Sequence, residues 1–315
     1  MLAVSRYVGG YKLPDYSVLM SVYDKELPEN LNQSLESMLM QTYPPSDFVL
    51  VCDGKLTNEL NIIVKSFQNE YKQIFRIVRI DENVGVGKAM NKGIKACRCD
   101  YIVRMDSDDV SLPDRCIKEM LLFAVMPELD MVGSFVEEFD DETDETVSIK
   151  KVPLLQKDIE SFCKRRNPFN RQTLAFRKSK AIEAGGYSDL KLCEDYEFAA
   201  RMLANGAKGQ NIPEVLVRYR VDSSTSEIRK SWRLTKAFIA VRWMIFTEGF
   251  IGFRDFFTPC IMQLMLFLLP MRFTRWVYRK FLRDTHIKPP TAEVKIDTPT
   301  KHKDTRYKGL KKTGK

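Results

Sequence analysis

Along the first two thirds of the chain, short apolar runs alternate with longer segments in which apolar residues recur every three or four positions. The short runs have the composition of buried strands, and the periodic segments have the spacing of amphipathic helices. Strands are therefore expected at 16–23, 48–52, 75–80, 101–105, 131–139, 173–176 and 215–220. Helices are expected at 30–41, 57–69, 87–97, 114–126, 153–164 and 194–205. This alternation predicts an α/β fold whose mostly parallel sheet is flanked by helices.

The pattern changes in the last third of the chain. Between residues 232 and 283, aromatic residues are interleaved with arginine and lysine, and the only long uncharged stretch, 256–271, has 16 residues. That stretch is shorter than the roughly 20 residues that a spanning helix needs. Aromatic faces flanked by arginines fit amphipathic helices that lie in a membrane interface. The alternative is a helical subdomain packed on the core, with its charges simply solvated.

Charge is divided along the chain in the same way. Residues 1–222 contain 30 Lys and Arg against 35 Asp and Glu, whereas residues 223–315 contain 20 against 7. The formal net charge of +8 therefore originates in the C-terminal third. A basic stretch binds nucleic acid or anionic lipid. The interleaved aromatic residues favour a membrane surface at 232–283, and no nucleic-acid partner is expected.

Cysteine and histidine usage limits the possible chemistry. The seven cysteines are scattered, odd in number and not preceded by a signal peptide, which indicates reduced thiols in a cytosolic protein. The two histidines, His286 and His302, both lie in the C-terminal tail. A zinc site is therefore not expected.

Three carboxylates, Asp106, Asp108 and Asp109, follow the expected strand at 101–105. At the end of a buried strand they would repel one another unless a cation lay between them. Oxygen ligands suit Mg²⁺ or Mn²⁺, and such an ion could bridge the phosphates of a nucleoside diphosphate. Asp53 also follows a strand, and ligands bind at the carboxyl ends of parallel strands. The alternative interpretation of the cluster is a solvated acidic turn.

A second acidic pair, Glu194 and Asp195, lies just before an expected helix. The pair either caps the helix or includes a general base, which in an in-line displacement comes from a different part of the chain than the metal ligands. Capping would lower the pKa of such a carboxylate, and a partly dry pocket would restore its basicity.

Taken together, the motifs resemble an inverting family 2 glycosyltransferase of the GT-A fold, of the amylovoran type found in bacterial exopolysaccharide, capsule and O-antigen assembly. The resemblance covers residues from about 16 to 225. It is carried by the order and spacing of Ser21-Val22-Tyr23, Gln41-Thr42-Tyr43-Pro44, Val51-Cys52-Asp53-Gly54, Asn83-Val84-Gly85, Gly87-Lys88-Ala89-Met90-Asn91, Arg104-Met105-Asp106-Ser107-Asp108-Asp109, Asn167-Pro168, Gly185-Gly186-Tyr187, Glu194-Asp195-Tyr196 and Tyr219-Arg220.

The resemblance implies a role for each matching residue. Asp53 would bind the nucleobase, Asp106 would reach the ribose or the metal, and Asp108 would ligate Mn²⁺ or Mg²⁺ with the support of Asp109. Asp195 would be the general base, with Glu194 beside it. The nucleotide pocket would be lined by Ser21, Tyr23, Asn83, Gly85 and Lys88.

The implied activity is the transfer of one hexose or N-acetylhexosamine from a UDP-sugar to a lipid-linked saccharide, at the cytoplasmic face of the inner membrane. The expected parts of the chain are three. The resemblance implies a GT-A catalytic domain at 1–225, while composition predicts a membrane-interface extension at 226–284 and a disordered basic tail at 285–315, which has almost no large apolar residues. The Gln-x-x-Arg-Trp signature of processive synthases does not occur, which favours transfer of a single sugar.

The sequence also departs from the family pattern at three positions. Cys52 stands where many family members have an acidic residue just before the aspartate that binds the nucleobase. Arg171 and Asp222 stand where relatives often have histidine. Two other functions remain open at this point. One is a nucleotidyltransferase, although the loop at 23–28 is acidic and has no glycine. The other is an inactive scaffold that binds membrane or nucleic acid.

Overall fold

The computed structural model describes residues 6–190, 192–221 and 231–268. Its strands are β1 (Tyr7–Val8), β2 (Tyr11–Lys12), β3 (Tyr16–Val22), β4 (Asp47–Asp53), β5 (Phe75–Ile80), β6 (Tyr101–Asp106), β7 (Val110–Ser111), β8 (Met131–Asp140), β9 (Thr146–Lys150), β10 (Ala175–Arg177) and β11 (Gly209–Val221). Its helices are α1 (Pro28–Leu39), α2 (Asn58–Glu70), α3 (Val86–Ala96), α4 (Arg115–Val125), α5 (Gln156–Cys163), the 3-10 helix η1 (Arg171–Thr173), α6 (Lys178–Glu183), α7 (Glu194–Ala204), α9 (Trp232–Thr247) and α10 (Phe253–Leu268).

One mixed sheet organises the fold, with the strand order β5-β4-β3-β6-β10-β8-β11-β7 and with β9 paired to β8. Strands β5, β4, β3 and β6 are parallel. Strand β10 runs antiparallel to both of its neighbours, and β11 then runs parallel to β8. The parallel half brings the ends of β3, β4 and β6 to one edge, where Ser21 lies opposite Asp106.

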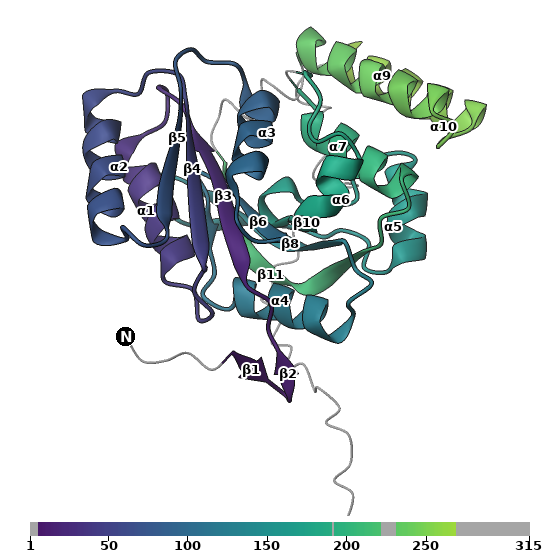
Figure 1. The fold of residues 1–315 in the computed structure, drawn as a ribbon. Coiled ribbons are helices and arrows are strands. Elements are labelled where there is room, and N and C mark those ends of the chain that lie inside the picture. The colour runs from purple at the N-terminus through teal and green to yellow at the C-terminus, as the bar shows by residue number, and fades with distance from the viewer. Residues whose placement is uncertain (1–5, 191, 222–230, 269–315) are drawn as a thin grey trace, which may run out of the picture.

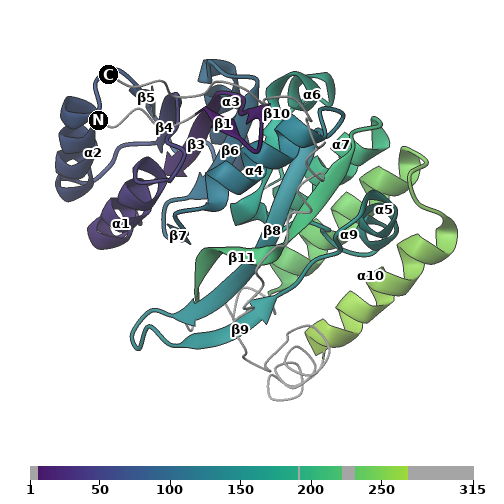
Figure 2. The same cartoon turned by 90° about the horizontal axis from the view of Figure 1, so that it is seen from below.

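Helices cover both faces of this sheet (Figures 1 and 2). Buried residues of α1, α2 and α4 form one apolar core against the sheet. Buried residues of α3, α5, α6 and α7 form a second core on the other face, and α9 and α10 extend it beyond α7 (Figure 1). The expected α/β architecture with helices on both faces of the sheet is therefore confirmed.

The expected elements are all present, with bounds that shift by a few residues. The largest difference is β11, which begins six residues before the expected strand, because it pairs with β8 along its length. The short elements β7, β9 and α6 were not predicted, because each carries too few periodic positions.

Two segments outside the predicted elements are ordered by contacts. The sequence before Tyr16 has no apolar periodicity that predicts an element, but β1 and β2 form a hairpin, and the buried Leu13 follows it. The acidic segment 140–145 forms the exposed turn between β8 and β9, and arginines of β11 bind it. Arg218 pairs with Asp144 at 2.8 Å, and Arg220 pairs with Asp141.

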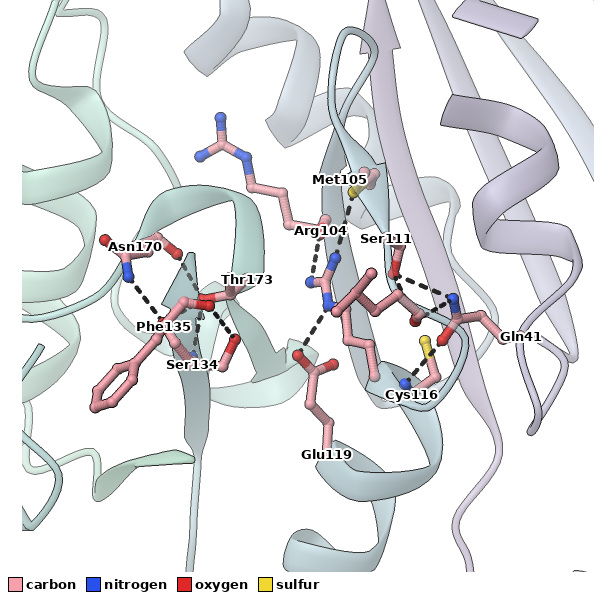
Figure 3. Close-up of polar contacts among 12 residues, drawn as sticks. Gln41, Arg104, Met105, Ser111, Cys116, Glu119, Ser134, Phe135, Asn170 and Thr173 are labelled. Atoms are coloured by element: carbon pink, nitrogen blue, oxygen red, sulfur yellow. Dashed lines mark hydrogen bonds and ion pairs between the residues drawn. The ribbon is translucent and has the colours of Figure 1, made fainter. Parts of the chain in front are cut away.

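Buried polar contacts fix α4 against β6, the strand that ends in the acidic cluster. The Arg115 guanidinium lies fully buried between the Glu119 carboxylate at 2.9 Å and the backbone oxygen of Arg104 at 2.8 Å. In Figure 3 the Arg104 side chain points away from Glu119, toward the opposite face of the sheet. Gln41 also joins α1 to this region through the Ser111 hydroxyl and the Cys116 amide.

Replacing Glu119 by alanine is expected to lower the free energy of unfolding by about 3–5 kcal/mol, because it leaves the Arg115 cation buried without its counterion. Burial raises the pKa of Glu119 to about 7. Urea unfolding of the wild type and the variant is therefore measured at pH 8, where Glu119 is mostly ionised and paired with Arg115. The matched control is Lys118→Ala on the same helix, whose partly exposed pair with Glu214 should contribute less than about 1 kcal/mol. Equal losses in the two variants would contradict this account.

Candidate active site

A cavity of about 1250 Å³ opens at the edge where the parallel strands end. The sequence-predicted residues that line it are Ser21, Tyr23, Asp53, Asn83, Gly85, Lys88, Asp106, Asp108, Glu194 and Asp195. Asp109 is fully buried and is not part of the lining. The structure therefore brings both acidic groups to one cavity, with Asp109 behind its wall.

The cluster Asp106, Asp108 and Asp109 can offer one carboxylate oxygen each, all within 4.8 Å of one another. Burial, with the nearby Asp106 and Glu26, raises the pKa of Asp108 to about 6, and burial raises the pKa of Asp109 well above its usual value. Asp109 Oδ2 is buried and has no hydrogen-bond partner among the described residues. Close carboxylates with an unsatisfied buried oxygen are the donor set that a hard divalent cation satisfies, so these residues fit such an ion.

Asp106 is held by two arginines. Its Oδ1 accepts a hydrogen bond from Arg104 Nη2 at 3.2 Å, and its Oδ2 accepts one from Arg171 Nε at 2.8 Å. Burial by itself would raise the pKa of Asp106, but Arg171 and Arg104 outweigh burial and hold it below its usual value. In the sequence, Arg171 stands out only as a departure from the family pattern, because no spacing along the chain shows that it contacts Asp106. Arg104 lies two residues before Asp106 on the same strand.

Asp53 orders the loop that was expected to line the nucleotide pocket. Its two carboxylate oxygens accept hydrogen bonds from the backbone amides of Val84 at 2.8 Å and Gly85 at 3.0 Å. Gly85 has a φ of 90° at the start of α3, a conformation that glycine adopts without strain. Each carboxylate oxygen keeps a second acceptor site, so Asp53 can still receive a donor from the cavity. Lys88, in the first turn of α3, pairs with Asp189 at 3.2 Å, and both residues line the cavity.

Glu194 and Asp195 are the first two residues of α7. Asp195 is half-buried and its Oδ2 accepts a hydrogen bond from Asn167 Nδ2 at 3.0 Å, which fixes the carboxylate. Burial and the adjacent Asp195 raise the pKa of Glu194. A half-buried carboxylate that is oriented by an amide and faces a cavity has the position that a general base needs.

The turn at Gly185–Tyr187 joins this pair to the acidic cluster. Both glycines have positive φ, and the Asn91 side chain bonds both the amide and the carbonyl of Tyr187. The Tyr187 hydroxyl accepts a hydrogen bond from Arg104 Nη1 at 3.3 Å, and its ring stacks on Phe198 of α7. The turn thereby connects β6 with the helix that begins at Glu194.

Two further residues support the cluster. Arg220 on β11 donates its backbone amide to Asp109 Oδ1 at 3.0 Å and its Nε to the Asp108 carbonyl at 2.8 Å. Glu26 accepts a hydrogen bond from the Ser107 hydroxyl. Arg220 belongs to the Tyr219-Arg220 motif, which was a usable signal in the sequence, whereas nothing in the local pattern around Glu26 distinguished it from a solvated acid.

Comparison with known proteins agrees with this geometry. The family model for glycosyl transferase family 2 matches residues 17–186. The chain is 34% identical over 268 residues to the amylovoran biosynthesis glycosyltransferase AmsE of Erwinia amylovora, covering 84% of this chain and 98% of AmsE. It is 33% identical to an Escherichia coli UDP-Gal:alpha-D-GlcNAc-diphosphoundecaprenol beta-1,3-galactosyltransferase, covering 86% and 97% of the two chains.

A solved structure shows the same fold. The mannosyltransferase PcManGT of Pyrobaculum calidifontis, in complex with GDP-Man and Mn²⁺, superimposes with a TM-score of 0.57 at 15% identity, over 83% of this chain and 72% of PcManGT. The fold, the matched family model and the two relatives lead to one assignment: the chain is a glycosyltransferase of family 2 with the GT-A fold.

Proposed function

We propose that the protein is an inverting, metal-dependent glycosyltransferase that moves one sugar from a UDP-sugar to a lipid-linked saccharide in bacterial surface polysaccharide or glycan biosynthesis. The observation that carries the proposal is the single cavity lined by both the acidic cluster and the Glu194–Asp195 pair. Single displacement at a sugar carbon needs a place for the departing diphosphate and, apart from it, a base for the acceptor hydroxyl. Family membership favours this reaction over nucleotidyl transfer and over a purely binding role.

The donor would lie on the side of the acidic cluster. Asp106 and Asp108, with Asp109 behind them, would hold Mn²⁺ or Mg²⁺, which supplies charge stabilisation for the leaving diphosphate. Asp53 would meet the nucleobase, while Ser21, Tyr23, Asn83, Gly85 and Lys88 would line the rest of the nucleotide pocket. The Mn²⁺ in PcManGT and the UDP-sugar in the name of the Escherichia coli relative support this choice of donor and ion.

Asp195 would take the proton of the acceptor hydroxyl. At the same time the acceptor oxygen would form a bond to the sugar carbon, and the bond from that carbon to the diphosphate would break. Asn167 holds the Asp195 carboxylate in place for this step. The neighbouring Glu194 is only 3% exposed, whereas Asp195 is half-buried, so Asp195 is the more accessible of the two to an acceptor hydroxyl and Glu194 would support it.

The C-terminal helices would bring this cavity to a lipid-linked acceptor. Arg233 and Leu234, in the first turn of α9, line the cavity. On α10, apolar side chains at a spacing of about one turn are exposed; these are Phe253, Phe257, Ile261, Met265 and Leu268. No helix among the described residues is long and apolar enough to cross a membrane. We therefore propose that this stripe lies in the interface of the cytoplasmic membrane face.

Basic residues support the same orientation. Arg233, Lys236 and Arg254 lie on the two described helices, and the adjoining sequence up to residue 283 adds further arginines. Cations near the surface of an anionic bilayer contribute about 1 kcal/mol each. The structure does not describe Asp222, residues 269–283 of the extension or the basic tail at 285–315. The proposed domain boundaries at 225 and 284 therefore stay a prediction.

Asp108→Asn is expected to weaken binding of UDP in the presence of Mn²⁺ by at least about tenfold, because a carboxylate ligand of the ion is lost. Calorimetric titration with UDP and Mn²⁺, repeated in EDTA, measures this. The matched control is Asp114→Asn, an exposed aspartate a few residues along the chain and outside the cavity. Unchanged, EDTA-insensitive binding of UDP to the variant would rule out the proposed metal site.

Asp195→Asn is expected to reduce kcat by about 10²–10⁴-fold while binding of UDP is retained, because only the proton acceptor is removed. Glu194→Gln should reduce kcat less. Transfer from a radiolabelled UDP-sugar to a lipid-linked acceptor, together with UDP titration, separates the two effects. Activity of Asp195→Asn close to wild type would assign the base elsewhere.

The double variant Phe257→Ser, Met265→Ser is expected to lose most of its binding to vesicles that contain anionic lipid, because it interrupts the exposed stripe on α10. Vesicle flotation at low and high salt measures the binding. The control is the double variant Ile62→Ser, Ile182→Ser, which removes exposed isoleucines from α2 and α6. Equal binding by the two double variants would refute membrane docking through α10.

A further inference from the structure

Arg171 is the one departure from the family pattern whose side chain enters the cavity among the described residues. Its guanidinium bonds Asp106 through Nε at 2.8 Å, and its Nη1 lies 4.0 Å from Glu194 Oε1. It therefore lies between the acidic cluster and the start of α7. This is the boundary between the proposed donor side and the proposed acceptor side of the cavity.

The backbone on both sides of Arg171 is fixed to the sheet. Asn170 is fully buried and donates to the carbonyl of Ser134 on β8 at 2.8 Å, while the Thr173 hydroxyl accepts the Ser134 amide at 2.9 Å (Figure 3). Arg171 begins the short helix η1 between these anchors. Its side chain therefore leaves a rigid support, so the direction in which it enters the cavity is largely set before any ligand binds.

Among the described residues, only Nε of the guanidinium makes a hydrogen bond, and Nη1 makes one long ion pair with Glu194. The hydrogen bonds among the described residues include none from Nη1 or Nη2, and 36% of the side chain is exposed at the cavity. Asp106 also receives the Arg104 guanidinium, so each of its two carboxylate oxygens already faces one arginine. A guanidinium whose Nη groups donate no hydrogen bond to the described residues and face a cavity is suited to bidentate contact with phosphate oxygens.

We infer that Arg171 is a catalytic residue that binds the diphosphate of the nucleotide donor and stabilises it as leaving group; this rests on the proposed function. As the acceptor oxygen bonds the sugar carbon, the bond from that carbon to the terminal phosphate oxygen breaks and its electron pair stays on the oxygen. The Nη groups donate hydrogen bonds to the charge that develops there. Asp106 acts on this step by orienting the guanidinium through Nε.

Loss of the Arg171 guanidinium should weaken binding of the phosphates and leave binding of the nucleoside unchanged. Arg171→Gln is expected to weaken binding of UDP by about 10- to 100-fold while leaving binding of uridine within about twofold, because uridine has no phosphate for Arg171 to contact. Arg171→Lys keeps the charge but not the fork, and should recover part of the affinity for UDP. In the transfer assay, Arg171→Gln should lower kcat at saturating donor as well as raise KM.

The control is Arg177→Gln, which removes another guanidinium–aspartate pair, with Asp130 at 3.2 Å, outside the cavity. Its thermal unfolding measures the structural cost of losing such a pair, and its affinity for UDP should stay within about twofold of wild type. Titrations use UDP, GDP, dTDP and their nucleosides, with Mg²⁺ or Mn²⁺.

Equal weakening of uridine and UDP by Arg171→Gln would show that Arg171 only supports the fold and would overturn the inference. Unchanged UDP affinity and unchanged kcat in that variant would also overturn it. If the wild-type protein binds none of the three nucleoside diphosphates, the proposed donor and this inference fail together. Binding by the wild type with no selective loss in the variant overturns the inference alone.

Discussion

Three carboxylates at the buried end of β6 are the constraint on which the rest of this structure depends. Each unpaired charge there would cost several kcal/mol. Arg104, two residues earlier on the same strand, bonds Asp106. Distant segments supply the rest: Arg171 bonds Asp106, and the Arg220 amide bonds Asp109. One buried oxygen of Asp109 is left without a partner among the described residues. The compensation is therefore incomplete, which is the condition under which a bound cation contributes most.

The same contacts connect the two sides of the cavity. Arg104 reaches from Asp106 to Tyr187, and Tyr187 stacks on Phe198 of the helix that begins with Glu194. Arg171 reaches from Asp106 toward Glu194 directly. Because these side chains belong to packed elements, the sheet and α7 set the distance from the proposed leaving-group site to the proposed base. Such preorganised charge is the main means by which an enzyme stabilises a polar transition state.

Helices α9 and α10 are part of the enzyme core as well as an exposed surface. Val241, Ile245, Phe256 and Cys260 belong to the same apolar cluster as α7. Arg242 is buried and donates to the Tyr196 hydroxyl at 2.9 Å, one residue after Asp195. The two interpretations of the aromatic, basic segment are therefore compatible: one face packs on the core while the stripe on α10 stays exposed, and we propose that this stripe meets lipid.

The sequence by itself determined the order of strands and helices, because apolar periodicity is a local property of the chain. It also determined that Asp53 and Asp106 lie at strand ends, since parallel strands end at a common edge. Motif order then indicated the family. The tertiary structure decided which distant side chains meet: Arg171 on Asp106, Asn167 on Asp195, and Glu26 beside Ser107. These pairs join residues whose contact depends on strand pairing and helix packing across the whole chain, and no local pattern contains that information.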